Sequence, residues 1–219
     1  METEVKLAFK DRESLLYAAS SEWFASHCRD LEGRSLTLQN HYLDTLDHKL
    51  GSRGVSLRKR HYLSDAADSY EFTVKYKGEV ESGLHKHFEW NLKSSDGIFD
   101  IEFFKRNAGG DDRGLLEDLL AGIGDKDLVI LCSNEFERVY RDFRYKESKM
   151  EACIDYGEIK DPEGKTCDII CEIELELMEG NTGDLTDAGK EIVERFGAVL
   201  FDETKFARTL KFSVTGGDL

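Results

Sequence analysis

The sequence predicts an α+β fold in which about eight antiparallel strands curl into a barrel, with charged side chains inside and helices outside. Three observations support this prediction. Most strand-like segments alternate charged and apolar residues, so each strand has one charged face and one apolar face. Amphipathic helical segments that could cover the apolar faces lie between them. Acidic and basic residues are also sorted onto different strands, whereas the solvated face of an open sheet, which is the alternative interpretation, usually mixes them.

Length and composition indicate a single domain over residues 1–219. The chain is 40% apolar and 34% charged, which is too apolar for a disordered protein. Its formal net charge of −15 argues against loose binding to DNA or RNA, so we expect no nucleic-acid partner. No stretch has the length and apolarity of a membrane span and no leader is recognised, which predicts a cytoplasmic protein without a membrane partner. The five cysteines include no Cys-x-x-Cys pair, so we expect reduced thiols.

The first half of the chain opens with a strand over residues 2–9, in which Glu2, Glu4 and Lys6 alternate with mostly apolar residues. Asp11 or Ser14 then offers a helix N-cap, and the apolar spacing predicts one helix over residues 12–29 with Trp23 and Phe24 in the core. The elements expected next are strands over 35–44, 55–60, 70–77 and 84–92 and short helical segments near 99–104 and 115–121.

The second half continues in the same style, with strands expected over 128–141, 149–155 and 167–177. A turn built on Asp161-Pro162-Glu163-Gly164 precedes the last of these strands. An amphipathic helix follows between Leu185 and Phe196, with Gly197 placed to end it. The tail over 201–210 reads as a short helix or strand that carries Lys205 and Arg208.

The segment from Cys171 to Leu177 alternates strictly, so Glu172, Glu174 and Glu176 share one strand face. Three carboxylates in a row repel one another. They therefore need water, bound cations, basic side chains opposite them, or raised pKa values.

Two other strands carry cations at the same spacing, Arg58 with Arg60 and Lys75 with Lys77. An acidic wall that faced a basic wall would hold metal ions on one side and a polyanion on the other. Clustered carboxylates suit Mg²⁺ or Mn²⁺, and pairs of arginine or lysine side chains suit phosphate oxygens.

Together these motifs resemble those of the CYTH superfamily, also called triphosphate tunnel metalloenzymes. The resemblance rests on Glu2-x-Glu4-x-Lys6, Arg58-x-Arg60, Lys75-x-Lys77 and Glu172-x-Glu174-x-Glu176, in this order. Segments 41–45, 151–157 and 204–208 extend it over nearly the whole chain. Within the superfamily, the stretch from Cys171 to Gly180 and the pair Glu151 and Asp155 are most similar to bacterial inorganic triphosphatases.

The resemblance implies an eight-stranded antiparallel tunnel that binds a linear triphosphate together with divalent metal ions. The groups expected to bind phosphate are Lys6, Arg58, Arg60, Lys75, Lys77, Arg138, Lys205 and Arg208. The groups expected to hold Mg²⁺ or Mn²⁺, as two ions, are Glu2, Glu4, Glu172, Glu174 and Glu176. One ion would bridge phosphate oxygens and the other would activate the attacking water. Glu2, Glu4, Lys6 and Lys205 are the candidate catalytic residues.

The predicted activity is hydrolysis of the terminal phosphoanhydride of inorganic triphosphate, or of a small organic triphosphate, by a protein that is a monomer or homodimer. Adenylate cyclase and thiamine triphosphatase activities are alternatives within the same superfamily. A module that binds polyphosphate or nucleotide without catalysis is an alternative from another class. The chain contains no Gly-x-x-x-x-Gly-Lys loop and no Gly-x-Ser-x-Gly motif, so kinase-like and acyl-transfer chemistry have no support.

His85, His87 and Glu89 allow a different interpretation, because two imidazoles and a carboxylate on one strand face could bind a transition metal. The simpler interpretation is that they are polar groups at the rim of the tunnel. Glu89, Glu151 and Asp155 could also line the tunnel or orient its cations.

Overall fold

The structure is a computed structural model that describes residues 2–30, 33–63, 69–160 and 165–213, without the side chains of Lys77 and Ser213. The turn expected at 161–164 lies outside the described residues. Within the described part, no helix combines the length and the apolar character needed to cross a bilayer.

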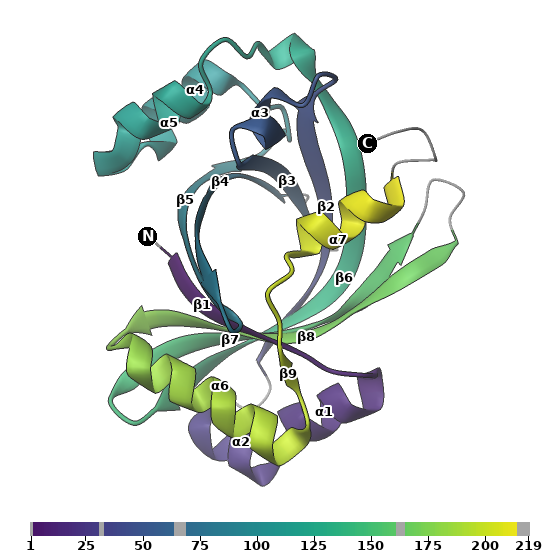
Figure 1. The fold of residues 1–219 in the computed structure, drawn as a ribbon, viewed down its shortest axis with the longest axis vertical. Helices are drawn as coiled ribbons and strands as arrows, with labels where there is room; N and C mark the ends of the chain where they lie inside the picture. The colour runs from purple at the N-terminus through teal and green to yellow at the C-terminus, as the bar shows by residue number, and fades with distance from the viewer. Residues whose placement is uncertain (1, 31–32, 64–68, 161–164, 214–219) are drawn as a thin grey trace.

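Eight antiparallel strands form a closed barrel in the order β5-β4-β3-β2-β6-β7-β8-β1, and β1 pairs back onto β5 (Figure 1). This confirms the predicted fold. The two-residue strand β9 (Val199–Leu200) adds to the edge of β1. The barrel strands are β1 (Glu2–Ala8), β2 (Arg34–Thr45), β3 (Val55–Leu63), β4 (Ser69–Glu81), β5 (Leu84–Ser94), β6 (Leu128–Tyr145), β7 (Ser148–Lys160) and β8 (Thr166–Glu179).

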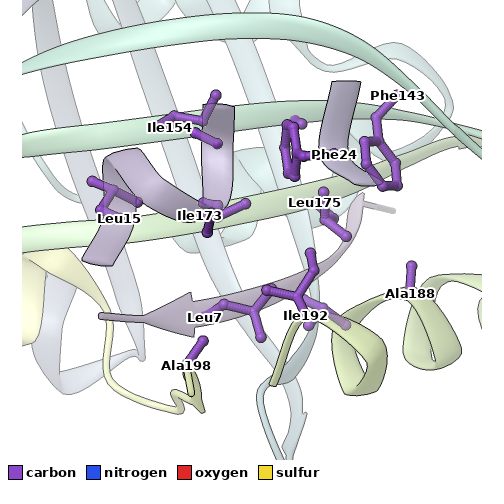
Figure 2. Close-up of a cluster of buried hydrophobic side chains, with 14 of the residues drawn as sticks. Leu7, Leu15, Phe24, Phe143, Ile154, Ile173, Leu175, Ala188, Ile192 and Ala198 are labelled. Atoms are coloured by element: carbon purple, nitrogen blue, oxygen red, sulfur yellow. The ribbon is translucent and has the colours of Figure 1, made fainter. Parts of the chain in front are cut away.

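Three helices pack on the outer face of β1, β6, β7 and β8, and they bury the apolar side of the acidic strand. Figure 2 shows Leu15, Phe24 and Ile192, one from each helix, gathered around Ile173 and Leu175 of β8. The helices are α1 (Arg12–Ser20), α2 (Glu22–His27) and α6 (Thr182–Phe196). Because apolar residues lie outside under helices, the charged residues at alternate positions must point into the barrel.

The single helix expected over 12–29 is wrong, because the chain breaks it at Ser21. This residue is extended (φ −65°, ψ 150°), and its Oγ accepts a hydrogen bond from the N–H of Phe24 at 3.1 Å. Ser21 thus ends α1 and caps α2. The expected cap at Asp11 is present, as part of a capping box with Ser14. Phe24 is fully buried, and Trp23 packs against the same core while remaining partly exposed.

A second helical layer covers β3, β4 and β5 on the opposite side of the barrel (Figure 1). Trp90 of β5 and Phe72 of β4 pack there against Phe104 and Leu116. The elements of this layer are α3 (Lys49–Ser52), α4 (Ile101–Ala108) and α5 (Arg113–Leu119), with the 3₁₀ turns η1 (Gly110–Asp112) and η2 (Asp125–Asp127).

The tail forms helix α7 (Lys205–Ser213), which lies against β6, β7 and β8 beside the opening of the barrel (Figure 1). Gly197, in the left-handed conformation (φ +70°), ends α6 before it, as the sequence predicts. Phe212 of α7 packs against a small apolar cluster built on Phe136 and Ile170. Phe136 and Ile170 lie two residues from Arg138 and Glu172, so they share the inward faces of β6 and β8. Part of the barrel interior is therefore apolar, which the alternation of charges did not predict.

Candidate active site

The barrel encloses a cavity of about 1040 Å³, called here the barrel cavity, to which all eight barrel strands and α7 contribute. Its size suits a small molecule. Ten of the residues predicted for the site line it: Glu2, Glu4, Lys6, Arg58, Arg60, Lys75, Arg138, Glu174, Glu176 and Lys205.

The acidic strands β1 and β8 are neighbours, and their register brings the expected metal ligands together. Glu4 lies opposite Glu176, and Lys6 lies opposite Glu174. Lys6 Nζ is 3.2 Å from Glu4 Oε1 and 3.2 Å from Glu174 Oε1. Burial alone would lower the pKa of Lys6, but Glu4 and Glu174 outweigh burial and raise it well above the usual value. The lysine of the Glu-x-Glu-x-Lys motif is thus held as a cation between two carboxylates.

Asp155 of β7 organises the cations next to this pair. Arg138 Nε and Nη2 donate to its two carboxylate oxygens at 2.6 and 2.5 Å, and Arg138 Nη2 also donates to Glu174 at 2.6 Å. Lys205 Nζ reaches the same two acids at 2.8 Å each. The sequence identified Asp155 only as a possible partner of the cations. Asp155 meets Arg138 and Lys205 when the barrel forms around them. Strand alternation does not predict which residues meet in the closed barrel.

A second charged group gathers around Glu2. His87 Nε2 lies 3.1 Å from Glu2 Oε2 and 3.3 Å from Glu89 Oε2, and Lys75 Nζ lies 2.5 Å from Glu89 Oε2. One ligand atom from each of Glu2, His87 and Glu89 lies within 4.8 Å of the others, so these three residues form a possible cation site. The alternative His-x-His-x-Glu set does not assemble in full, because His85 Nε2 instead contacts the carbonyl oxygen of Phe201 at 3.0 Å.

Glu176 lines the cavity without an ion pair to any cation that the structure describes. No hydrogen bond or ion pair joins it to another described residue. Burial raises the pKa of Glu176 to about 8, and the nearby carboxylates of Glu2, Glu4 and Glu89 contribute to the shift. Crowded carboxylate oxygens of this kind fit a divalent cation, which would replace the proton.

Arg58 and Arg60 present cations from β3. Arg58 Nη2 donates to Thr73 Oγ1 at 2.8 Å, and the carboxylate of Glu71 is 3.8 Å away. Arg58 Nε is buried and has no hydrogen-bond partner among the residues that the structure describes. Arg60 Nε donates to Asn40 Oδ1 at 3.0 Å. These contacts leave guanidinium donors free for phosphate oxygens.

Glu172 and Arg208 do not line the barrel cavity. Arg208 Nη1 lies 3.2 Å from Glu172 Oε1, and Arg208 Nε donates to Asp168 Oδ2 at 2.8 Å. Lys205 Nζ lies 3.3 Å from Glu172 Oε2. These contacts fasten α7 to β8. Lys77 lies in β4, and its side chain is outside the described part of the structure.

The expected separation into an acidic and a basic wall is only partial. Lys6 lies within the acidic wall, and Glu89 and Glu71 lie beside the cations of β3 and β4. Strand alternation places these groups inside the barrel but does not say which neighbours they meet across it.

A closed antiparallel barrel that encloses carboxylates, arginines and lysines in one cavity defines the class of charged-tunnel proteins. The chain matches the CYTH domain over residues 1–210 and therefore belongs to the CYTH family.

Relatives with known sequences or structures are consistent with this assignment. An inorganic triphosphatase from Haemophilus influenzae is 32% identical over 157 residues, which make up 72% of this chain and 40% of the relative. This chain thus spans less than half the length of that protein. A protein from Hippeastrum, described as a candidate adenylyl cyclase with a dominant triphosphatase activity, superposes with a TM-score of 0.70 at 17% identity, over 98% of both chains. A candidate adenylate cyclase from Bacillus halodurans superposes with a TM-score of 0.62 at 21% identity, over 95% of this chain and 96% of that one.

Proposed function

We propose that this protein is a metal-dependent triphosphatase that hydrolyses the terminal phosphoanhydride of inorganic triphosphate or of a small organic triphosphate. The observation that carries the proposal is the composition of the barrel cavity. It combines guanidinium groups with free donors, at Arg58 and Arg60, with a crowded carboxylate group around Glu176. A bound polyanion needs the guanidinium donors, and bound divalent cations need the carboxylates. The likeness to an inorganic triphosphatase supports the same substrate class.

Cations from different strands would bind different phosphate oxygens of the substrate. Arg58, Arg60 and Lys75 would bind phosphate oxygens from β3 and β4, and Arg138 would bind them from β6. Four of these cations are already paired with acids of the cavity and would bind more weakly unless those acids turned to a metal ion: Lys6, Lys75, Arg138 and Lys205. Fixing the phosphate chain between these groups would hold its terminal phosphorus for in-line attack by water.

The carboxylates of the cavity fit Mg²⁺ or Mn²⁺, which prefer oxygen ligands. Glu2, Glu4, Glu174 and Glu176 line the cavity and are the residues that would hold the ions. Glu172 belongs to the predicted set but contacts Lys205 and Arg208. When bound, such ions neutralise phosphate charge and acidify water. Carboxylates facing a polyanion without cations between them would repel it, which favours an enzyme over a simple phosphate-binding module.

The experiment that tests the proposal offers tripolyphosphate, thiamine triphosphate and ATP, each with Mg²⁺ and with Mn²⁺, and identifies the products. Orthophosphate released from a triphosphate is the expected result. Cyclic AMP from ATP would instead assign adenylate cyclase activity. Binding of these ligands without turnover would assign a binding module and refute the proposed hydrolysis.

Two variants test the metal assignment. Glu4→Gln and Glu174→Gln keep the shape of each side chain but remove a charge, so we expect kcat/KM to fall at least about 100-fold at fixed Mg²⁺. Glu194→Gln, on the exposed surface of α6, is the matched control and should retain full activity. A folded Glu4→Gln protein with wild-type kcat/KM would refute the role of Glu4 as a ligand. Cytoplasmic location and a monomeric or homodimeric state stay predictions of the sequence.

A further inference from the structure

Arg60 is a buried cation that meets a neutral oxygen instead of an acid. It is 5% exposed, and its Nε donates to Asn40 Oδ1. Among the residues that the structure describes, no carboxylate lies within ion-pair distance of it. Burial lowers the pKa of Arg60, and the positive charges of Arg58 and Arg138 lower it further. An arginine in this setting carries an uncompensated charge, so an anion that entered the cavity would gain a strong partner there.

Asn40 is the first member of a chain of hydrogen bonds that leads from Arg60 to α7. Asn40 Nδ2 donates to Asn134 Oδ1 at 3.0 Å, and Asn134 Nδ2 donates to Thr209 Oγ1 at 2.8 Å. Thr209 Oγ1 donates in turn to the carbonyl oxygen of Lys205 at 2.7 Å. Asn40, Asn134 and Thr209 are all buried. The chain thus connects β3, β2, β6 and α7 through the interior of the barrel.

The two ends of this chain fix its direction. A guanidinium N–H can only donate, and a backbone carbonyl can only accept. Each side chain between them supplies one acceptor and one donor, so a single orientation of both amides satisfies every member. If Asn40 were turned over, its NH₂ group would face the N–H of Arg60. Arg60 therefore requires the carbonyl oxygen of Asn40 to face it, and the contacts of Asn134 and Thr209 hold Asn40 in that orientation and connect it to α7.

We propose that Asn40 is a positioning residue for the triphosphate: it holds the guanidinium of Arg60 with a neutral oxygen and so leaves its charge available for phosphate. Asn134 and Thr209 connect this contact to α7 by hydrogen bonds and so help to hold Asn40 in place. The inference rests on the proposed function, because the anion is taken to be a triphosphate. An aspartate at position 40 would hold the guanidinium as well as asparagine does, but it would neutralise the charge.

The test compares Asn40→Asp with the wild type by calorimetric titration with a non-hydrolysable imido analogue of tripolyphosphate in Mg²⁺. We expect Asn40→Asp to raise Kd about tenfold, the equivalent of one charge-assisted hydrogen bond. Asn134→Asp adds the same charge one side chain further from Arg60 and should raise Kd less. Unchanged or tighter binding by Asn40→Asp would mean that Asn40 only supports the fold, and the proposal would be overturned.

A double-mutant cycle separates an effect through Arg60 from general repulsion. In an Arg60→Gln background, Asn40→Asp should change Kd less than about twofold, because the charge that it neutralises is gone. Equal weakening in both backgrounds would overturn the proposal. If Asn40→Asp does not fold, Asn40→Leu serves in its place. It removes the acceptor, and wild-type affinity in that variant would be equally decisive.

Two variants of Thr209 test the end of the hydrogen-bond chain that lies in α7. Thr209→Val removes the hydroxyl and should raise Kd about threefold, whereas Thr209→Ser should restore binding because it keeps the hydroxyl. Wild-type affinity in Thr209→Val would show that α7 does not help to hold Asn40 in place. These outcomes are separate from the proposed hydrolysis. A wild-type protein that bound the analogue but cleaved no triphosphate would refute that activity and leave the binding comparison valid.

Discussion

The three glutamates of β8 lie on one strand face but have different neighbours. Glu172 contacts Lys205 and Arg208, and Glu174 contacts Lys6, Arg138 and Lys205. Burial raises the pKa of Glu174, but its cationic neighbours outweigh burial and bring it well below the usual value. The pKa of Glu176 rises to about 8. Burial also raises the pKa of Glu172. Of the three, Glu174 is thus the one whose pKa is lowered, and burial favours the protonated form of the other two.

The raised pKa of Glu176 predicts a specific pH dependence of stability. The folded protein binds this proton more tightly than the unfolded chain, whose glutamate titrates near 4.5. The contribution of this proton to stability is therefore complete below that value and is lost as the pH rises through about 8. Glu176→Gln keeps a neutral side chain at all pH values. Its free energy of unfolding should exceed that of the wild type by about 1–3 kcal/mol at pH 9 and match it near pH 4.

Urea unfolding in EDTA at pH 4, 7 and 9 measures this difference without divalent ions. Glu194→Gln, on the exposed surface, is the control and should follow the wild type at every pH. A constant difference between Glu176→Gln and the wild type across this range would contradict the assigned protonation.

At the residue scale, strand alternation predicted most of the charged side chains that line the cavity, although Glu172 of the same pattern does not line it. Glu2, Glu4, Arg58 and Lys75 were predicted because each repeats a charged residue at i+2. Asn40 and Asn134 could not be found in this way, since an isolated asparagine in a strand is equally compatible with a solvated face. Their importance comes from meeting each other across the β2–β6 pair.

At the scale of the element, α7 differs from an ordinary surface helix. Its charged and polar residues Lys205, Arg208 and Thr209 are buried against the barrel, whereas a surface helix turns such residues to water. The tail sequence alone therefore did not decide between helix and strand. The choice depends on acids of β7 and β8 that face these cations.

Arg208 is expected to anchor α7 and not to contact substrate. Arg208→Met would leave Glu172 without one of its cations, because the guanidinium joins Glu172, Asp168 and the carbonyl of Ile169. We expect the free energy of unfolding to fall by about 2–4 kcal/mol. Thermal unfolding and limited proteolysis after residue 204 measure the effect. A stable Arg208→Met protein with a raised KM would instead restore the predicted role in substrate binding.

The break at Ser21 shows a second limit at this scale. The apolar spacing from residue 12 to residue 29 is continuous, so a periodic pattern cannot detect the break. A serine that both ends one helix and caps the next is a local signal, but serine also occurs inside helices exposed to water.

At the scale of the whole molecule, the net charge of −15 and the charged cavity predict that stability depends on cations. Mg²⁺ and tripolyphosphate each bring charge that the other compensates. Their joint effect on Tm should therefore exceed the sum of their separate effects. At about 100 times its Kd, each ligand alone would contribute about 2.7 kcal/mol, or several degrees for a chain of this size, and the two together should contribute more than twice that.

Thermal unfolding of the protein with Mg²⁺, with tripolyphosphate and with both measures this coupling. Glu4→Gln should lose most of the joint shift, whereas Glu194→Gln should retain it. Strictly additive shifts would mean that metal and phosphate bind independently, at separate places.

The barrel could be predicted from the sequence because most strands carry the same two-faced pattern. A sheet with one charged and one apolar face buries its apolar face when it closes under helices. The apolar cluster around Phe136 and the ion pairs across the cavity could not be predicted from the sequence. They depend on which strands face one another across the interior, and that follows from register and closure.

Closure at β1 also has a consequence for how the chain folds. Residues 2–5 pair with the start of β5, and residues 4–8 pair with residues 172–176 of β8. At ordinary synthesis rates the second partner emerges roughly ten to thirty seconds after the first strand. During that time β1 presents an unpaired edge, the kind of surface on which nascent chains aggregate. Glu2, Glu4 and Lys6 give that edge charge, so we expect the residues that later line the cavity also to disfavour pairing between neighbouring nascent chains.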